Sequence, residues 1–134
     1  RDTWKDGIHS YLTYLRDQQD LTGGFLSFVP WTFQAQTKNF PIRHVKSWEY
    51  LRMVGAARLF LDNIPHIEVS IMVMGRELAE LGLYAGADDI SSIVIEENVL
   101  ASRGLKTMRA AEKYLREAGF EPRRRKLSYE MYGI

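Results

Sequence analysis

Two kinds of hydrophobic spacing alternate along this chain, and this alternation limits its fold more than any other feature. Apolar side chains recur every three or four residues in some segments, as in helices, and form short extended runs in others, as in strands. The predicted helices cover residues 3–20, 76–85 and 106–118, with a further helix from Ser47 to a stop at 63–65, and the predicted strands cover 25–29, 67–73 and 89–95. Because helices connect the strands, we expect parallel strands with right-handed crossovers, which is an α/β fold.

The faces of the predicted strands indicate which kind of α/β sheet this is. Within 67–73 the odd-numbered residues are all apolar and share one face, whereas Glu68, Ser70 and Met72 share the other. A sheet covered by helices on both faces would show nearly continuous apolar strands. One small, polar face is more typical of a barrel wall around a ligand. Since a closed (β/α) barrel typically has eight strands, we expect a partial barrel, with Ser27, Glu68, Ser70 and Ser92 lining its cavity.

Polar and aromatic residues gather where the predicted strands end, which is where parallel α/β proteins carry their chemistry. Trp31, Thr32 and Gln34 follow the first strand, and Glu96 and Asn98 follow the third. An aromatic ring there can stack on a planar ligand, while the polar side chains supply directional hydrogen bonds. A second interpretation is equally open: the aromatic side chains pack beneath a long loop, and the polar groups hold that loop in place.

Charge and hydropathy exclude several classes of partner. Eighteen basic and seventeen acidic residues leave a formal net charge of +1, which gives no electrostatic reason to expect nucleic acid or an anionic membrane surface. No apolar run is long enough to cross a membrane, and the first residues are too polar for a signal peptide, so the expected location is the cytoplasm. The chain does not begin with methionine, and we therefore expect it to be a piece of a longer polypeptide.

The chain contains no cysteine, so by itself it can form no disulfide, thiolate zinc site or cysteine-ligated iron–sulfur cluster. Its three histidines, His9, His44 and His66, fall in different predicted elements and predict no metal site. Neither the glycine-rich dinucleotide motif nor the P-loop motif occurs, so neither standard nucleotide site is predicted.

Five short segments, at residues 18–25, 28–34, 57–65, 86–89 and 96–99, share their order and spacing with one enzyme family. Together they resemble the carboxyl-terminal half of the radical S-adenosylmethionine enzymes of the futalosine route to menaquinone. The Pro-Trp-Thr-Phe-Gln sequence within 28–34 is most similar to the cyclic dehypoxanthine futalosine synthases. Aminofutalosine synthases and deazaflavin synthase subunits are also similar.

The resemblance implies a fold and a reaction. It implies that residues 1–134, with a tail at 120–134, form about the carboxyl-terminal half of a TIM-type barrel. In the family, a [4Fe–4S] cluster held by a CxxxCxxC motif cleaves S-adenosylmethionine, and the radical chemistry that follows cyclises dehypoxanthine futalosine. Because this chain lacks cysteine, the cluster and S-adenosylmethionine are expected on an amino-terminal half that acts as its partner.

The resemblance also assigns roles to residues. It implies that Trp31, Thr32, Gln34, Glu96 and Asn98 contact a nucleoside-like substrate, while the catalytic initiator lies outside this chain. By itself the chain is therefore expected to hold no cofactor and to be inactive.

Other interpretations stay open. The chain would alternatively be a half-barrel that binds a nucleoside-like ligand without catalysis, or part of an aminofutalosine or deazaflavin synthase. Segment 86–89 also resembles a short stretch of bacterial receiver domains, which would indicate signalling. Since a half-barrel has two open strand edges, we expect the isolated chain to form a homodimer through them.

Overall fold

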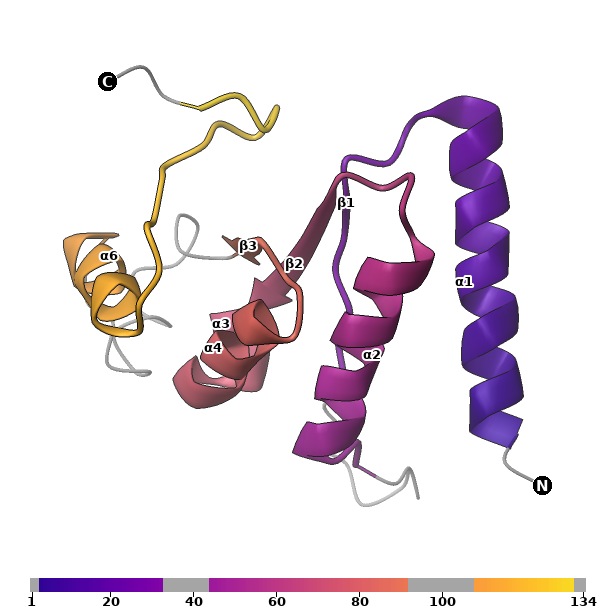
Figure 1. The fold of residues 1–134 in the computed structure, drawn as a ribbon, viewed down its shortest axis with the longest axis horizontal. Helices are drawn as coiled ribbons and strands as arrows, with labels where there is room; N and C mark the ends of the chain where they lie inside the picture. Colours follow the sequence, from indigo (N-terminus) through magenta and orange to yellow (C-terminus); the bar gives the residue numbers. More distant parts are fainter. Residues whose placement is uncertain (1–2, 33–43, 92–107, 132–134) are drawn as a thin grey trace.

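The computed structural model describes residues 3–32, 44–91 and 108–131 (Figure 1). In chain order they form α1 (Thr3–Thr22), β1 (Ser27–Phe28), α2 (Ser47–Phe60), β2 (His66–Ser70), α3 (Ile71–Met74), α4 (Arg76–Tyr84), β3 (Asp89–Ser91) and α6 (Met108–Glu117). Figure 1 shows α1 and α2 lying side by side, with α2 between α1 and the remaining helices.

The three strands form one parallel sheet in the order β1-β2-β3. Ser27 of β1 pairs with His66, and Glu68 and Ser70 of β2 pair with Asp89 and Ser91 of β3. Consecutive strands are thus also neighbours in space, and helices connect them. The predicted α/β fold with parallel strands is confirmed.

Apolar residues on one face of the sheet form the core beneath the helices. Ile67 and Val69 of β2 are fully buried, and α4 approaches them closely through Gly82, where a Cβ atom would lie 2.8 Å from Val69 Cγ1. The rest of the core consists of Leu12, Phe28, Tyr50, Val54, Ala57, Leu61, Ile64, Ile71, Ala79, Ala87 and Ala111. Because strand side chains alternate, Glu68 and Ser70 belong to the opposite, polar face.

The buried side-chain amide of Gln19 fixes the start of the sheet. Its Nε2 donates to the carbonyl oxygens of Phe25 at 3.0 Å and Asn63 at 3.1 Å, and its Oε1 accepts from the Phe25 N–H at 2.8 Å. The Asn63 side chain also connects to α1, because its Nδ2 donates to the Arg16 carbonyl at 2.9 Å. One amide therefore connects the end of α1, the entry to β1 and the loop before β2.

The second strand is shorter than the predicted segment 67–73. It ends at Ser70, and residues 71–74 form one helical turn, α3, instead of continuing the strand. The Ser70 hydroxyl accepts a hydrogen bond from the Val73 N–H at 3.4 Å, which caps this turn. Gly75, with φ +80°, then separates α3 from α4 in a backbone conformation that glycine adopts easily.

The tail after α6 folds back as a hairpin. Its sequence alone is compatible with either an extended segment or an edge strand. Arg125 and Met131 form an antiparallel bridge, and the Lys126 N–H donates to the Glu130 carbonyl at 2.8 Å. Figure 1 shows this hairpin (yellow) at the end of the molecule where the strands begin. Residues 125–131 are called the tail hairpin below.

Candidate functional site

The segment that follows β1 lies beside a cavity of about 320 Å³, which residues of α1 and α2 also line. The Thr32 hydroxyl donates to Met74 Sδ at 3.5 Å, which connects the segment after β1 to α3. Trp31 beside it is 61% exposed, so its ring is accessible. The cavity is lined by Ile8, Tyr11, Phe28, Val29, Pro30, Trp31, Thr32, Val45, Glu49, Tyr50 and Met53. These positions suit the predicted ligand contacts of Trp31 and Thr32, which remain predictions.

The other predicted site residues differ in where they lie. Ser70 is fully buried, and its hydroxyl caps α3. Four more, Gln34, Ser92, Glu96 and Asn98, fall outside the described residues. The structure therefore brings Trp31 and Thr32 together at one end of the sheet, and it places Ser27 and Glu68 toward the other end.

Tyr50 contributes a buried hydroxyl to the wall of this cavity. Its side chain is 2% exposed, and among the described residues its hydroxyl has no hydrogen-bond partner. Burial raises the pKa of Tyr50 to about 12, so the phenol is neutral at physiological pH. A neutral phenol can donate or accept a hydrogen bond, and this hydroxyl is therefore chemically suited to a polar group that enters the cavity.

The amino ends of the strands carry a second cluster of polar side chains, which the sequence did not predict as a unit. Arg125 Nε lies 2.9 Å from Asp89 Oδ2, and Arg125 Nη2 reaches both Asp89 and, at 3.4 Å, Glu68 Oε2. The Tyr129 hydroxyl lies 2.9 Å from Glu68 Oε2 and 3.1 Å from Asp89 Oδ2. The predicted cavity residue Glu68 thus contacts the tail hairpin.

The surroundings within this cluster favour a charged Arg125 and a neutral Tyr129. The hydrogen bond to Asp89 raises the pKa of Arg125, so the guanidinium is firmly charged. Burial raises the pKa of Tyr129 far above its ordinary value, and the neighbouring Glu68 carboxylate acts in the same direction. The arrangement is that of a structural clamp with one cation, one neutral phenol and two carboxylates.

Asp88 anchors the start of β2 and β3 from the side. Its Oδ1 accepts from Arg58 Nη2 at 2.6 Å and from the Ile67 N–H at 2.8 Å, and its Oδ2 lies 2.7 Å from His66 Nδ1. Burial works against ionisation, but the hydrogen bonds from His66 and Ile67 and the Arg58 charge together lower the pKa of Asp88. The His66 ring in turn stacks on Tyr129, with ring centroids 4.2 Å apart.

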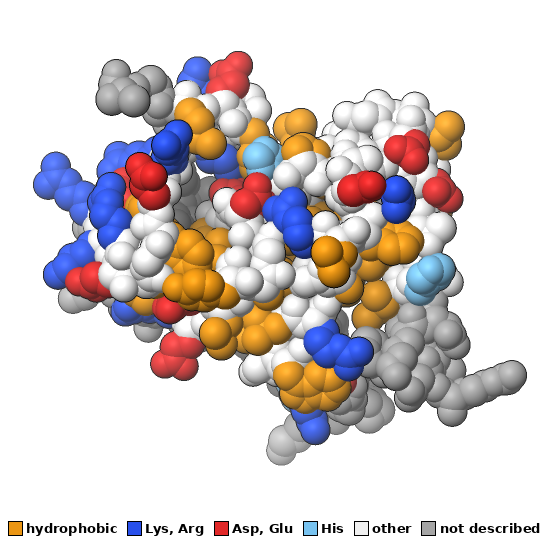
Figure 2. All heavy atoms as spheres, in the orientation of Figure 1, with side chains coloured by type: hydrophobic (Ala, Val, Ile, Leu, Met, Phe, Trp, Pro, Cys, Tyr) orange, Lys and Arg blue, Asp and Glu red, His pale blue; other side chains and the backbone are white. Residues whose placement is uncertain are grey.

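Residues 123–126 are all basic, and only one of them, Arg125, turns inward to the sheet. Arg125 reaches the sheet, whereas Arg124 pairs at 2.5 Å with Glu112 on α6. Figure 2 shows Lys and Arg side chains gathered over α6 and the tail, among acidic ones. The predicted faces gave no signal for the clamp: with Ser92 on the polar face, Asp89 falls on the other face of its strand, and only the observed register places it beside Glu68.

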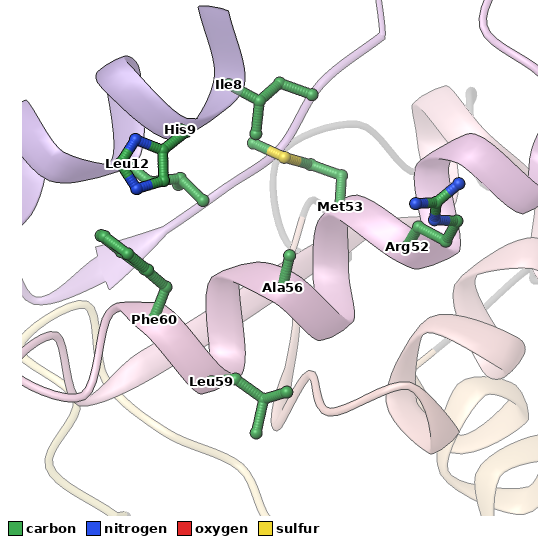
Figure 3. A pocket seen from close by; sticks show the side chains of 8 residues that line it. All are labelled: Ile8, His9, Leu12, Arg52, Met53, Ala56, Leu59 and Phe60. Atoms are coloured by element: carbon green, nitrogen blue, oxygen red, sulfur yellow. The ribbon is translucent and has the colours of Figure 1, made fainter. Parts of the chain in front are cut away.

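A further cavity of about 330 Å³ lies between α1 and α2 (Figure 3). Ile8 of α1 and Met53 of α2 point toward one another, and the rings of His9 and Phe60 meet edge to face with centroids 5.6 Å apart. Its lining is mainly apolar, and it shares Ile8 and Met53 with the cavity at the end of β1.

Two kinds of site or segment are missing from the part of the chain that the structure describes. Across residues 3–32, 44–91 and 108–131, no three His, Asp or Glu side chains come together in a way that could hold a metal ion. In the same ranges no helix has both the length and the apolar character that a membrane span requires.

Comparisons with known proteins agree with the resemblance that the residues carry. The model of the "CofH/MqnC C-terminal region" family matches residues 22–134. A cyclic dehypoxanthine futalosine synthase of Streptomyces coelicolor is 42% identical over 124 residues, which is 90% of this chain and 31% of that protein. The chain thus spans about a third of the length of this relative.

Two other enzyme types are also similar to this chain. An aminodeoxyfutalosine synthase of Thermus thermophilus is 35% identical over 77% of this chain and 31% of its own length. A 5-amino-6-(D-ribitylamino)uracil–L-tyrosine 4-hydroxyphenyl transferase of Methanospirillum hungatei is 37% identical over 72% of this chain and 28% of its own length. The family prediction made from the five sequence segments is confirmed.

Proposed function

The chain belongs to the family of the CofH/MqnC C-terminal region, and from this membership we propose that it forms the substrate-side wall of a larger radical S-adenosylmethionine enzyme. The proposed reaction is the radical cyclisation of dehypoxanthine futalosine in menaquinone biosynthesis. The observation that carries the proposal is the 42% identity to a cyclic dehypoxanthine futalosine synthase over 90% of this chain.

The fold supports a role as barrel wall. Helices cover one face of the parallel sheet, and the other face carries Glu68, Ser70 and Asp89. We propose that this face lines the cavity of a TIM-type barrel, whose remaining strands lie in the two thirds of the relative's length that this chain does not span. An amino-terminal half would then be the partner that pairs with the open edge of the sheet.

The iron–sulfur cluster that the family implies does not fit the residues present. Cysteine thiolates are the ligands of such clusters, and the chain has none. The proposal therefore assigns the cluster to the partner half, and assigns to this chain the binding and orientation of substrate. Trp31 would stack on a planar ring, while Thr32, Gln34, Glu96 and Asn98 would supply hydrogen bonds.

The test is an assay of the full polypeptide that carries this chain, purified anaerobically with its cluster reconstituted. Incubation with S-adenosylmethionine and dehypoxanthine futalosine is expected to release 5′-deoxyadenosine and a cyclised product. If the enzyme turned over only the substrate of aminodeoxyfutalosine synthases, the proposed substrate would be wrong. Binding of the nucleoside without turnover would favour a non-catalytic binding module.

A substitution tests the assignment of the site within that assay. Trp31→Ala is expected to raise the KM for substrate about tenfold with a smaller effect on kcat, because the stacked ring contributes to binding. Trp48→Ala, at the other exposed tryptophan near the start of α2, is the matched control and should leave both constants unchanged. Equal effects of the two substitutions would remove Trp31 from the substrate site.

A further inference from the structure

Two carboxylates lie next to each other on the polar face of the sheet. Glu68 and Asp89 are register partners in neighbouring parallel strands, and their side chains are only 11% and 14% exposed. Carboxylates that close to one another repel, and partial burial removes the water that would screen them. The pair is therefore stable only if another group compensates its charge.

The tail hairpin supplies that compensation across more than 35 residues of sequence. Arg125 pairs with Asp89 and Glu68, and the Tyr129 hydroxyl lies within hydrogen-bond distance of the same two carboxylates. Arg125 also lies over the Tyr129 ring, with its guanidinium carbon 4.0 Å from the ring centroid. The two residues thus act as one unit.

The hairpin contacts all three strands. Besides the two carboxylates on β2 and β3, Tyr129 hydrogen-bonds to Ser27 of β1 and stacks on His66 at the start of β2. Tyr129 has φ +63°, a left-handed conformation that is unfavourable for a tyrosine. Such an unfavourable backbone conformation persists only where surrounding contacts determine it, and here the Tyr129 side chain makes those contacts on three strands.

The position of the clamp along the strands is informative. Glu68 and Asp89 stand two residues before Ser70 and Ser91, which corresponds to about 7 Å at the rise of a strand. Trp31 and Thr32 follow the opposite, carboxyl end of β1. The hairpin therefore covers the amino-end part of the polar face, whereas Ser70, farther along β2, is buried beside the α3 turn that it caps.

We propose that Arg125 and Tyr129 are positioning residues that form the floor of the ligand cavity, by holding Glu68 and Asp89 away from the bound substrate. This inference rests on the proposed function, because it takes the polar face as the wall of the proposed barrel cavity, which is a different space from the 320 Å³ cavity lined by α1, α2 and the segment after β1. The floor sets how deeply a ligand enters and keeps two negative charges from facing it. Neither residue contacts the reacting atoms.

The charge balance predicts a pH-dependent signature for loss of Arg125. The groups that face the two carboxylates are Arg125, Tyr129 and Ser27, and the nearby His66 and Arg58 are both tied to Asp88. Without Arg125 the two carboxylates have no cation of their own, so their mutual repulsion is no longer compensated. Lower pH then relieves the repulsion by adding a proton, and a loss of packing alone would not depend on pH in this way.

The experiment uses the full polypeptide with Arg125→Met, Arg125→Lys and Tyr129→Phe. Arg124→Met is the matched control, since Arg124 pairs with Glu112 on α6 instead of the sheet. Arg125→Met is expected to lower the melting temperature more at pH 8 than at pH 5.5 and to raise KM about tenfold with a smaller change in kcat. Arg125→Lys should keep the melting temperature and KM close to their wild-type values. Tyr129→Phe should change both in the same direction as Arg125→Met but less, and Arg124→Met should change neither the melting temperature nor KM.

The outcomes separate this inference from the proposed function. An equal loss of melting temperature at both pH values would overturn the clamp, and an unchanged KM in the folded Arg125→Lys and Tyr129→Phe variants would overturn its role as a floor. If the polypeptide does not turn over dehypoxanthine futalosine, the proposed function fails, while the pH dependence of the melting temperature still decides the clamp. If Arg125→Met does not fold, the melting temperatures and KM of Arg125→Lys and Tyr129→Phe provide the test instead.

Discussion

At the scale of single residues, the Tyr50 hydroxyl, which has no hydrogen-bond partner within residues 3–32, 44–91 and 108–131, predicts an unusual gain in stability. A buried hydroxyl without a hydrogen bond costs free energy, and Tyr50→Phe removes it while keeping the ring in the core. We expect Tyr50→Phe to raise the free energy of unfolding by about 1 kcal/mol, measured by urea denaturation of the full polypeptide. Tyr14→Phe, at an exposed tyrosine, is the control and should be neutral. A clear loss of stability in Tyr50→Phe would show that a polar partner occupies the cavity.

Asp88 gives a prediction on pH at the same scale. Because the folded state lowers the pKa of Asp88, its ionised form stabilises the fold above the ordinary aspartate pKa of about 3.9, and this contribution is lost as pH falls through the lowered folded value. Wild type and Asp88→Asn should therefore differ clearly in melting temperature at pH 7 and much less near pH 3. A difference that is the same at both values would contradict the importance of the charge. Asp62→Asn, at an exposed ion pair with Arg16, should show a small difference throughout.

At the scale of elements, the contact between α4 and β2 depends on the absence of a side chain at Gly82. A Cβ atom there would lie 2.8 Å from Val69 Cγ1, so Gly82→Ala must push the helix away from the strand. We expect a loss of about 1–3 kcal/mol in unfolding free energy, measured by denaturant titration. Gly7→Ala on α1 is the control, because nothing lies within 4 Å of the added atom. There the better helix propensity of alanine should increase stability by up to about 1 kcal/mol, opposite in sign to Gly82→Ala.

The elements themselves were largely predictable from the sequence because their hydrophobic spacing is local. The strand bounds were the exceptions, since β1 covers only Ser27–Phe28 of the predicted 25–29, and β2 ends at Ser70. Residues 71–74 are all apolar, so the period of a strand and that of a helix fit them equally. The cap from Ser70 and the positive φ of Gly75 decided in favour of a helical turn. These two local features are visible in the sequence only as a serine and a glycine, both of which also occur in strands and loops.

The positions of candidate site residues were predictable where a general rule for parallel sheets places them, and not where a distant contact does; their ligand contacts stay predictions. Trp31 and Thr32 follow a strand, so the rule for parallel sheets was enough to select them. Arg125 and Glu68 are 57 positions apart, and Arg125 stands in a run of four basic residues. Nothing local in that run distinguishes the arginine that turns inward, so the clamp emerged only once the strand register had placed Glu68 beside Asp89.

At the scale of the whole molecule, the open edges of the sheet predict association of the isolated chain. β1 pairs with β2 through only two residues, and neither its outer edge nor that of β3 pairs with another strand among the described residues. We expect sedimentation of the isolated chain to show concentration-dependent dimers, as exposed strand edges pair with a second copy. Adding the separately produced amino-terminal part of the full polypeptide should replace the dimer with a one-to-one complex. A chain that stays monomeric at high concentration would contradict this.

The clamp also has a consequence for the order in which the protein is built. Translation proceeds from the amino end, so a ribosome completes Glu68 and Asp89 well before it reaches Arg125 and Tyr129. During that interval the nascent sheet carries its acidic pair without the guanidinium that later joins it. Among the described elements the hairpin is the last to be synthesised, and a product that ended before residue 125 would expose a pair of repelling carboxylates to cellular quality control.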